Sequence, residues 1–355
     1  MHKTYDLHVV ETRPLVNPAL LHKEFPISET ATELVAETRD RIRNILCNED
    51  QRLLVIVGPC SVHDIDAAEE YGQKLAKLRT ELSDKLEIVM RVYFEKPRTQ
   101  VGWKGLINDP HLDNSYDINT GLRLARKLLI DLAAMGLPAG TELLDPITPQ
   151  YIADIIAWTA IGARTTESQT HREMASGLSM PIGFKNNTDG SLQAATNAMV
   201  AASQPHHFLG INADGLASIV STTGNPDGHL VLRGGKGGPN YAVDQVEAAA
   251  KSLTELGVNP RIMIDCSHAN AMKQHERQVD VLEEVAQQLK DGSQHILGVM
   301  IESHLVAGNQ KIPKDLDQLV YGQSITDACV DFETTEQMLR MLAQAVGTRD
   351  AIAVG

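Results

Sequence analysis

Short apolar runs alternate with longer amphipathic segments along most of the chain. Eight apolar runs have the length and composition of buried strands: 53–57, 86–92, 140–143, 160–163, 181–184, 229–232, 261–264 and 297–301. Helix-period segments lie between them, at 67–82, 121–135, 149–158, 192–202, 243–256 and 279–289. This alternation predicts a parallel sheet covered by helices, and eight strands favour a closed (β/α)8 TIM barrel over an open doubly wound sheet.

Three segments interrupt the alternation. The loop 93–119 is long and rich in Lys, Arg, Gly and Pro, which is typical of a substrate-binding loop. Residues 206–221 contain two strand-like runs around Asn212-Ala213-Asp214-Gly215, which predict an inserted β-hairpin. Residues 1–45 precede the first strand, and we expect them to form an arm or helix with an interface and regulatory role. Residues 46–355 would then form the catalytic barrel.

The composition is that of an ordinary globular protein, with 43% hydrophobic and 22% charged residues. A net charge of −14 argues against a nucleic-acid partner or an anionic membrane surface, because bulk electrostatics would repel both. The N-terminal residues lack the apolar run of a signal peptide, and no stretch approaches the roughly 20 apolar residues that span a bilayer. Four scattered cysteines do not form a disulfide framework, so we expect a cytoplasmic protein.

Polar side chains follow or end all eight predicted strands. Catalytic groups of (β/α)8 barrels lie at the carboxyl ends of the strands. The residues found there are Cys60, Arg91, Glu142, Arg164, Lys185, Arg233, His268 and Glu302. Strand ends meet solvent and are often polar, so any one of these residues has a plain structural explanation. All eight together, with four Arg or Lys among them, favour a functional rim.

Three of these side chains can bind a metal ion, and an aspartate in the loop after the last strand could be a fourth ligand. The four residues are Cys60, His268, Glu302 and Asp327. Thiolate, imidazole and carboxylate donors suit Mn²⁺, Fe²⁺, Co²⁺ or Zn²⁺ better than Ca²⁺ or Mg²⁺. Each residue could instead be a buried thiol, a loop histidine or a solvated acid. Their shared position at strand ends favours one divalent metal ion.

Basic residues make up a second set on the same rim: Arg91, Lys96, Arg98, Arg164, Lys185 and Arg233. Arg presents a fork that matches carboxylate or phosphate, whereas Lys acts as a mobile point charge. Each residue alone could form an ordinary surface ion pair. Six cations on one rim would repel one another without anions, so the set predicts a small substrate with at least two strongly anionic groups.

Several motifs resemble those of the 3-deoxy-D-arabino-heptulosonate-7-phosphate (DAHP) synthases. They are Gly58-Pro59-Cys60-Ser61, Arg91-Val92-Tyr93-Phe94-Glu95-Lys96-Pro97-Arg98-Thr99, Gly102-Trp103-Lys104-Gly105, Gly162-Ala163-Arg164-Thr165-Thr166-Glu167-Ser168, Gly183-Phe184-Lys185-Asn186, Leu232-Arg233-Gly234-Gly235-Lys236, Asp265-Cys266-Ser267-His268 and Ser324-Ile325-Thr326-Asp327. The resemblance runs over nearly the whole chain and is to the type I, feedback-regulated bacterial and fungal branch.

The resemblance implies condensation of phosphoenolpyruvate with erythrose 4-phosphate, the first step of the shikimate pathway to the aromatic amino acids. It implies that Cys60, His268, Glu302 and Asp327 bind the metal. Arg91, Lys96 and Lys185 would hold the phosphoenolpyruvate carboxylate, and Arg164 and Arg233 its phosphate. Arg98 and Thr99, with Pro97 beside them, would bind the phosphate of erythrose 4-phosphate. Lys96, Lys185 and His268 are the candidate catalytic residues, and the sequence leaves open which lysine donates a proton.

Two alternative functions are compatible with the same type of fold and site. The first is 3-deoxy-octulosonate-8-phosphate synthase, which condenses the same enol with arabinose 5-phosphate. Those enzymes are shorter and carry Lys-Ala-Asn where this chain has Lys96-Pro97-Arg98, so Arg98 favours the four-carbon acceptor. The second is a non-catalytic regulatory homologue, which is disfavoured because every ligand and phosphate-binding position of the family is filled.

The resemblance also implies feedback inhibition at a separate site. In regulated members, the inserted hairpin and nearby helices bind an aromatic amino acid. The matching positions are Gln150, Leu178, Ser179, Phe208, Gly210 and Val220, with Asp6 from the N-terminal arm of a partner subunit in a homodimer or homotetramer. Core packing would explain the apolar positions equally well. Phenylalanine-sensitive relatives have Ser where this chain has Gly210 and tyrosine-sensitive ones have Gly, so tyrosine is the expected inhibitor.

Overall fold

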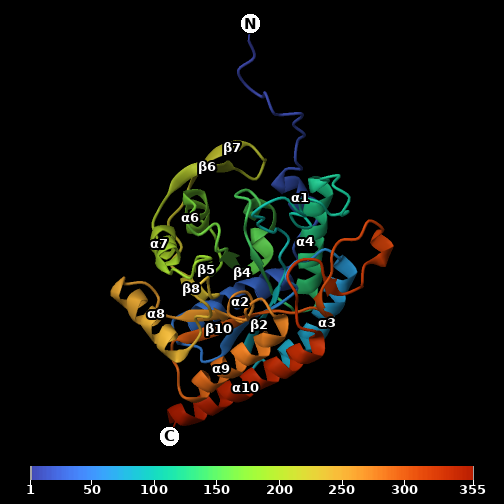
Figure 1. The fold of residues 1–355 in the computed structure, drawn as a ribbon. Coiled ribbons are helices and arrows are strands. Elements are labelled where there is room, and N and C mark those ends of the chain that lie inside the picture. The colour runs from blue at the N-terminus through green and yellow to red at the C-terminus, as the bar shows by residue number, and fades with distance from the viewer. Residues whose placement is uncertain (1, 355) are drawn as a thin grey trace.

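The computed structural model describes residues 2–354 of the chain, with side chains to residue 349. Eight parallel strands form a closed barrel in the order β1-β10-β9-β8-β5-β4-β3-β2. Their bounds are β1 Leu53–Gly58, β2 Leu86–Arg91, β3 Ala139–Glu142, β4 Ile156–Ile161, β5 Ile182–Lys185, β8 Gly228–Leu232, β9 Ile262–Asp265 and β10 Ile296–Glu302. The predicted (β/α)8 barrel is confirmed, and helices surround the strands (Figure 1).

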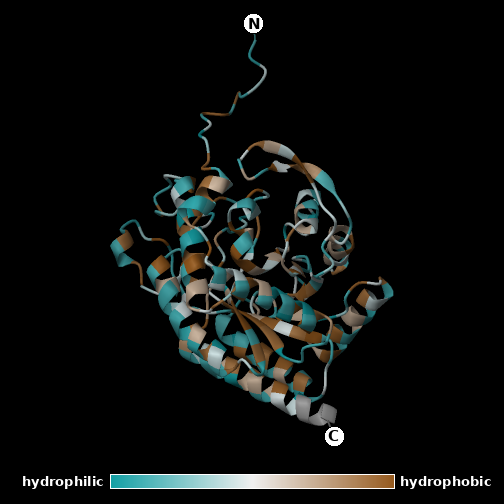
Figure 2. Ribbon diagram, turned by 180° about the vertical axis from the view of Figure 1, so that it is seen from behind, coloured by the Kyte–Doolittle hydropathy of each residue, from teal (hydrophilic) through white to brown (hydrophobic). Residues whose placement is uncertain are grey.

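The surrounding helices follow the strands along the chain. They are α3 Ile65–Glu81, α4 Ile118–Ala134, α5 Pro149–Ile152, α6 Gln169–Ser176, α7 Gln193–Ala202, α8 Val243–Glu255, α9 Gln278–Lys290 and α10 Phe332–Val354. Figure 2 shows apolar strands at the centre and mixed helices with polar residues outside. No helix within residues 2–354 has the length and apolar character that a bilayer span requires.

Every residue of the barrel strands is buried, which explains their nearly continuous apolar runs. In β1, Leu54 and Ile56 belong to the cluster inside the barrel, whereas Leu53, Val55 and Val57 pack in the cluster shared with the helices. The alternation of side chains along a strand produces this division. The strands therefore have two mainly apolar faces, and most of their charged side chains lie at or near the strand ends.

Helix α2 (Glu29–Leu46) lies across the amino-terminal ends of the barrel strands. Ile42, Ile45 and Leu46 are buried with residues from inside the barrel. The side chain of Arg39 donates to the carbonyl of Ile156 at the start of β4, and Arg43 pairs with Asp227 just before β8. This end of the barrel is thus covered by the chain's own helix, which is preceded by helix α1 (Pro18–Glu24). The interface and regulatory role expected for residues 1–45 stays a prediction.

The segment 149–161 differs from its prediction. A single helix was predicted over 149–158, but α5 ends at Ile152, a 3-10 turn covers Ala153–Ile155, and β4 begins at Ile156. The run of apolar residues at 155–161 fits either a helix or a buried strand by periodicity alone. Trp158 decides the outcome, because it is fully buried inside the barrel.

Two helices have no counterpart in the predicted set. Helix α6 begins after Ser168, whose hydroxyl accepts a hydrogen bond from the amide of His171. Helix α10 ends the chain, and Met338, Leu339 and Leu342 pack it against the barrel. The short strands β11 (Val306–Asn309) and β12 (Gln323–Ser324) pair within the loop between β10 and α10.

The predicted hairpin is present as strands β6 (His207–Ile211) and β7 (Ala217–Ser221). It stands away from the barrel on the side from which the N-terminal residues extend (Figure 1). The amide of Ala19 in α1 donates to the carbonyl of Ala213 in the hairpin turn at 2.8 Å. Phe208 and Val220 are half-buried on one face, whereas Leu209 and Ile219 are paired and exposed on the other.

Candidate active site

An open cavity of about 660 Å³ lies at the carboxyl ends of the barrel strands. Its lining residues are Arg91, Lys96, Pro97, Arg98, Glu142, Gly162, Ala163, Arg164, Lys185, Thr188, Arg233, His268, Thr326 and Asp327. Every basic residue predicted for the rim is in this set. Thr99 is exposed and is not a lining residue, and Cys60 and Glu302 are buried beside the cavity.

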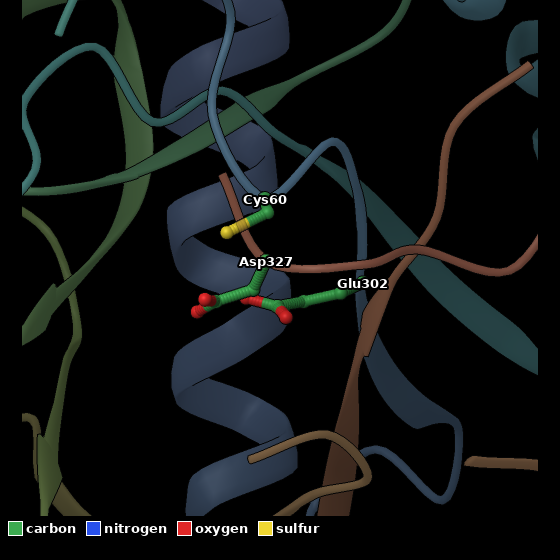
Figure 3. Close-up of side chains that lie close together, drawn as sticks. All are labelled: Cys60, Glu302 and Asp327. Atoms are coloured by element: carbon green, nitrogen blue, oxygen red, sulfur yellow. The ribbon is translucent and has the colours of Figure 1, made fainter. Parts of the chain in front are cut away.

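Three of the predicted metal ligands lie together. The Cys60 sulfur and the carboxylates of Glu302 and Asp327 point toward one another (Figure 3), with donor atoms within 4.8 Å of each other. Cys60 follows β1 and Glu302 ends β10, which are hydrogen-bonded neighbours in the barrel. Gly58 permits the close approach of this loop to β2, because its φ is +155° and a Cβ there would lie 2.6 Å from the Arg91 carbonyl oxygen.

His268, the fourth predicted ligand, lies at the edge of this cluster. Its Nε2 is 4.0 Å from Glu302 Oε1, and its Nδ1 is 3.0 Å from the carboxylate of Asp265. The backbone of His268 has a φ of +55°, which turns the ring back toward the strand ends. A carboxylate behind an imidazole that faces a metal is a common arrangement, because it fixes the ring orientation and raises ligand basicity.

The donor set fits a borderline divalent cation. Burial and the charge of Glu302 raise the pKa of the Cys60 thiol, and a bound cation would favour the thiolate instead. Burial would also raise the pKa of Glu302, but Arg91 and then His268 hold it at about 2. A buried carboxylate that stays ionised beside a thiol, a second carboxylate and an imidazole offers the mixed S, N and O ligands that Mn²⁺, Fe²⁺, Co²⁺ or Zn²⁺ accept.

Arg91 and the two lysines already have protein partners. Arg91 is buried, stacks 3.6 Å from the centre of the Tyr93 ring, and donates to Glu302 at 2.8 Å and to the Cys60 carbonyl at 3.1 Å. Lys96 Nζ lies 3.2 Å from the Cys60 sulfur. Lys185 Nζ lies 3.2 Å from Asp265. These three cations therefore form the charged floor of the cavity and are positioned by its acids.

The three remaining arginines form fewer hydrogen bonds with the described residues. Arg98 donates through Nε to the Trp103 carbonyl at 2.7 Å, and Arg164 donates only a long bond of 3.4 Å to the Pro97 carbonyl. The guanidinium of Arg233 has no hydrogen bond or ion pair to any residue that the structure describes. Their guanidinium groups line the cavity with donors available to an anionic ligand.

Asp265 is the functional residue that the strand-end reading missed. It is fully buried at the end of β9 and contacts both Lys185 and His268. Burial alone would raise its pKa, but His268 and then Lys185 hold the pKa of Asp265 well below its ordinary value. The sequence carries a signal for it, since Asp265 directly follows the apolar run 261–264 at the end of its strand.

A second cavity, of about 680 Å³, lies between the hairpin and helices α5 and α6. It is lined by Pro146, Pro149, Gln150, Ala153, Met174, Gly177, Leu178, Ser179, Phe208, Gly210, Ile211 and Val220. The structure thus brings together all six residues that were assigned to the inhibitor site within one chain. Asp6 is exposed on the N-terminal arm and does not line this cavity.

Comparisons with known proteins agree with this geometry. The family model described as "DAHP synthetase I family" matches residues 24–340. The chain is 55% identical over 344 residues to the Phe-sensitive phospho-2-dehydro-3-deoxyheptonate aldolase of Escherichia coli (strain K12), covering 97% of this chain and 98% of the relative. It is 52% identical over 339 residues to the Tyr-sensitive form of the same strain (96% and 95%). It is 54% identical over 349 residues to the Trp-sensitive form of Enterobacter agglomerans (98% and 100%).

A solved structure is similar over almost its whole length. The phospho-2-dehydro-3-deoxyheptonate aldolase of Francisella tularensis SCHU S4 superposes with a TM-score of 0.94 at 52% sequence identity, covering 96% of this chain and 99% of that one. The chain belongs to the DAHP synthetase I family.

Proposed function

We propose that this protein condenses phosphoenolpyruvate with erythrose 4-phosphate and water to give DAHP and phosphate. The observation that carries the proposal is the cavity itself. In it, a thiol and two carboxylates that could bind a metal ion lie beside six cationic side chains. Such a site suits a substrate pair with two phosphates and a carboxylate. Membership of the DAHP synthetase I family supports the same reaction and its place at the start of aromatic biosynthesis.

Each substrate anion has candidate partners in the cavity. Lys96 and Lys185, above the buried Arg91, would bind the phosphoenolpyruvate carboxylate. Arg164 and Arg233 would bind its phosphate, since their guanidinium groups have few or no protein partners. Arg98, together with Thr99 and Pro97 of the same loop, would bind the phosphate of erythrose 4-phosphate.

These side chains would stabilise the charges that develop during the reaction. Carbon 3 of phosphoenolpyruvate attacks the aldehyde carbon, so the aldehyde oxygen gains negative charge and carbon 2 becomes electron-poor. A divalent cation held by Cys60, His268, Glu302 and Asp327 would supply Lewis acidity at this centre. Lys96 and Lys185 are the two candidate proton donors to the new hydroxyl group. Water then adds to carbon 2, and cleavage of the bond between carbon 2 and the phosphate oxygen releases phosphate near Arg164 and Arg233.

The reaction is tested by measuring phosphate release from phosphoenolpyruvate. Enzyme treated with a chelator should be inactive, and Mn²⁺, Fe²⁺, Co²⁺ or Zn²⁺ should restore activity. Release should require erythrose 4-phosphate, and arabinose 5-phosphate should not replace it. Phosphate release that is independent of erythrose 4-phosphate would contradict the proposed reaction, and turnover with arabinose 5-phosphate would favour the octulosonate alternative.

We further propose that the cavity beside the hairpin binds tyrosine as a feedback inhibitor. Gly210 supports this choice, because a Cβ at this position would lie 2.7 Å from a methyl group of Val220 and reduce the space in the cavity. The relatives include Phe-, Tyr- and Trp-sensitive proteins at 52–55% identity, so overall similarity does not select among them. Inhibition assays with each amino acid test the proposal, and phenylalanine acting at lower concentration than tyrosine would overturn it.

The arm is proposed to complete this site in a homodimer or homotetramer. The cavity is lined by apolar and uncharged polar residues, which leaves the charged ends of an amino acid to be matched from elsewhere. Asp6 could supply a carboxylate from the partner's arm, on which Tyr5, Leu7 and Val10 are exposed. Deletion of residues 1–12 should abolish inhibition and leave uninhibited turnover intact. Unchanged inhibition of the truncated protein would exclude a role for the arm.

A further inference from the structure

Three asparagines are linked beneath the rim of the active-site cavity, and we call them the asparagine bridge: Asn186, Asn240 and Asn270. Asn186 follows β5, Asn240 ends the loop after β8, and Asn270 lies in the loop after β9. The Asn240 side chain donates to Asn186 Oδ1 at 3.2 Å, and the Asn240 backbone amide donates to Asn270 Oδ1 at 2.9 Å. Asn186 and Asn270 are buried, so the bridge is shielded from water.

The bridge binds the backbone on both sides of Arg233. Asn186 Oδ1 accepts from the Arg233 amide at 2.8 Å, and Asn240 Oδ1 accepts from the Gly234 amide at 2.7 Å. Asn186 Nδ2 donates to the Gly234 carbonyl at 3.0 Å, and Asn270 Nδ2 donates to the Leu232 carbonyl at 3.1 Å. Four polar backbone atoms of three consecutive residues are therefore held by side-chain amides.

The same segment has little freedom to move elsewhere. Gly234 has a φ of +68°, and a Cβ there would lie 2.8 Å from backbone atoms of Ala269 and Asn270. The Arg233 carbonyl accepts from the Ala269 amide at 3.2 Å. The backbone at Arg233 is thus packed directly against the loop that carries His268.

This rigidity matters because the Arg233 side chain has no protein partner of its own among the described residues. An unpaired guanidinium is positioned only by its backbone and its rotamer. A fixed backbone lowers the entropy lost when the side chain binds an anion, which is how preorganisation raises affinity. The asparagine bridge supplies that fixed backbone.

We propose that Asn186, Asn240 and Asn270 are positioning residues, which hold the backbone of Arg233 so that its side chain can bind the phosphate of the substrate. The inference rests on the proposed function, since it takes phosphoenolpyruvate as the ligand of Arg233. An amide is needed at Asn186, which both accepts and donates to the backbone. A carboxylate would lose the donor, and an aliphatic side chain would lose both functions.

Asn240 is the best position for a test, because it is half-buried and can be truncated with less risk to folding. Calorimetric titration with phosphoenolpyruvate should give a dissociation constant roughly tenfold or more higher for Asn240→Ala than for the unmodified protein. The effect should act through Arg233. In an Arg233→Ala background, Asn240→Ala should therefore change the dissociation constant by less than about twofold, because coupled residues give non-additive effects.

Asn259 provides a matched control at the other end of the barrel. It is also half-buried and also binds backbone through both ends of its amide, donating to the Leu46 carbonyl and accepting from the Arg261 amide. Asn259→Ala should lower the melting temperature by an amount comparable to Asn240→Ala, while phosphoenolpyruvate affinity stays unchanged. If Asn240→Ala does not fold, Asn240→Leu keeps a similar side-chain volume, removes the side-chain hydrogen bonds to Gly234 and Asn186, and replaces it in the same cycle.

The outcomes separate this inference from the proposed function. An unmodified protein that binds no phosphoenolpyruvate would remove the proposed function. Binding by the unmodified protein, with an equal loss of affinity from the Asn240 change whether or not Arg233 is present, would overturn the positioning role and leave a purely structural one. Unchanged affinity in a folded Asn240 variant would also overturn it.

Discussion

Asp265 contacts both Lys185 and His268 from beneath the cavity. Its carboxylate lies 3.2 Å from Lys185 and 3.0 Å from His268, and it is fully buried. Loss of its charge would leave the Lys185 ammonium buried without a counter-ion and would free the His268 ring to rotate. Asp265 does not line the cavity, but it positions two residues that do, Lys185 and His268.

We expect Asp265→Asn to weaken metal binding by roughly 10- to 100-fold, the usual cost of removing the carboxylate behind a metal-binding histidine. Competition with a chromophoric chelator measures this affinity directly. Asp189→Asn is a suitable control, because Asp189 is exposed in the loop after β5. Unchanged affinity in the Asp265 variant would show that His268 is oriented by other contacts.

Gly210→Ser should weaken tyrosine inhibition, because the new side chain must displace Val220 or enter the inhibitor cavity. The concentration of tyrosine for half-inhibition should rise about tenfold, which corresponds to roughly 1.4 kcal/mol of lost binding. Turnover without inhibitor should not change, since Gly210 lies outside the active-site cavity. Ser221→Ala at the end of β7, an exposed position on the opposite face of the hairpin, should leave inhibition unaltered.

The strand-end rule predicts six of the fourteen cavity-lining residues from the sequence, because barrel geometry fixes where strand ends meet. It could not show that Arg91 is paired with Glu302 or that Lys185 is paired with Asp265. Those pairs join residues from different strands, and no local pattern encodes which cation meets which acid. The residues proposed for the inhibitor site are predicted by family resemblance alone, since apolar positions such as Leu178 have the pattern of ordinary core residues.

At the scale of elements, the wrong helix prediction over 149–158 and the position of helix α2 have the same explanation. Periodicity describes how a segment could be buried, but its neighbours decide which structure it adopts. Residues 156–161 form β4 because they pair with β3 on one side and β5 on the other. Helix α2 has an amphipathic pattern of its own, and only the folded chain shows that its apolar face covers the barrel interior.

Ile42→Ala tests the contribution of this helix to stability. Ile42 is fully buried with Leu54, Val89 and Met300 from inside the barrel. The free energy of unfolding should fall by roughly 2–5 kcal/mol, because truncation of a buried side chain leaves a cavity. Denaturant titration measures the loss. Glu33→Ala on the exposed side of α2 should change stability by no more than about 0.5 kcal/mol, and an equal effect of both changes would contradict the assigned burial.

At the scale of the whole molecule, the barrel core contains a histidine that makes stability depend on pH. His229 is fully buried and accepts a hydrogen bond from Trp158 Nε1 at 3.2 Å. Burial lowers its pKa from the ordinary 6.5 to about 4. Between these pH values the unfolded chain binds a proton at His229 that the folded chain does not. The free energy of unfolding therefore decreases as the pH falls from 6.5 toward 4.

His229→Gln should reduce this pH dependence, since glutamine can also accept from Trp158 and does not titrate. The difference in unfolding free energy between the two proteins should change by roughly 3 kcal/mol between pH 6.5 and pH 4, following the size of the pKa shift. Chemical denaturation across this range provides the measurement. Parallel curves for the two proteins would mean that His229 titrates normally in the folded state.

The packed interior of the barrel has a consequence for how ligands reach the active site. Side chains such as Leu54, Trp158 and Met300 fill the space between helix α2 and the strand ends, so the interior is not a channel. Access is therefore from the carboxyl ends of the strands, where the cavity opens. Under the proposed function, a released phosphate would leave past the arginines that an incoming phosphate meets, so product and substrate would compete for the same opening.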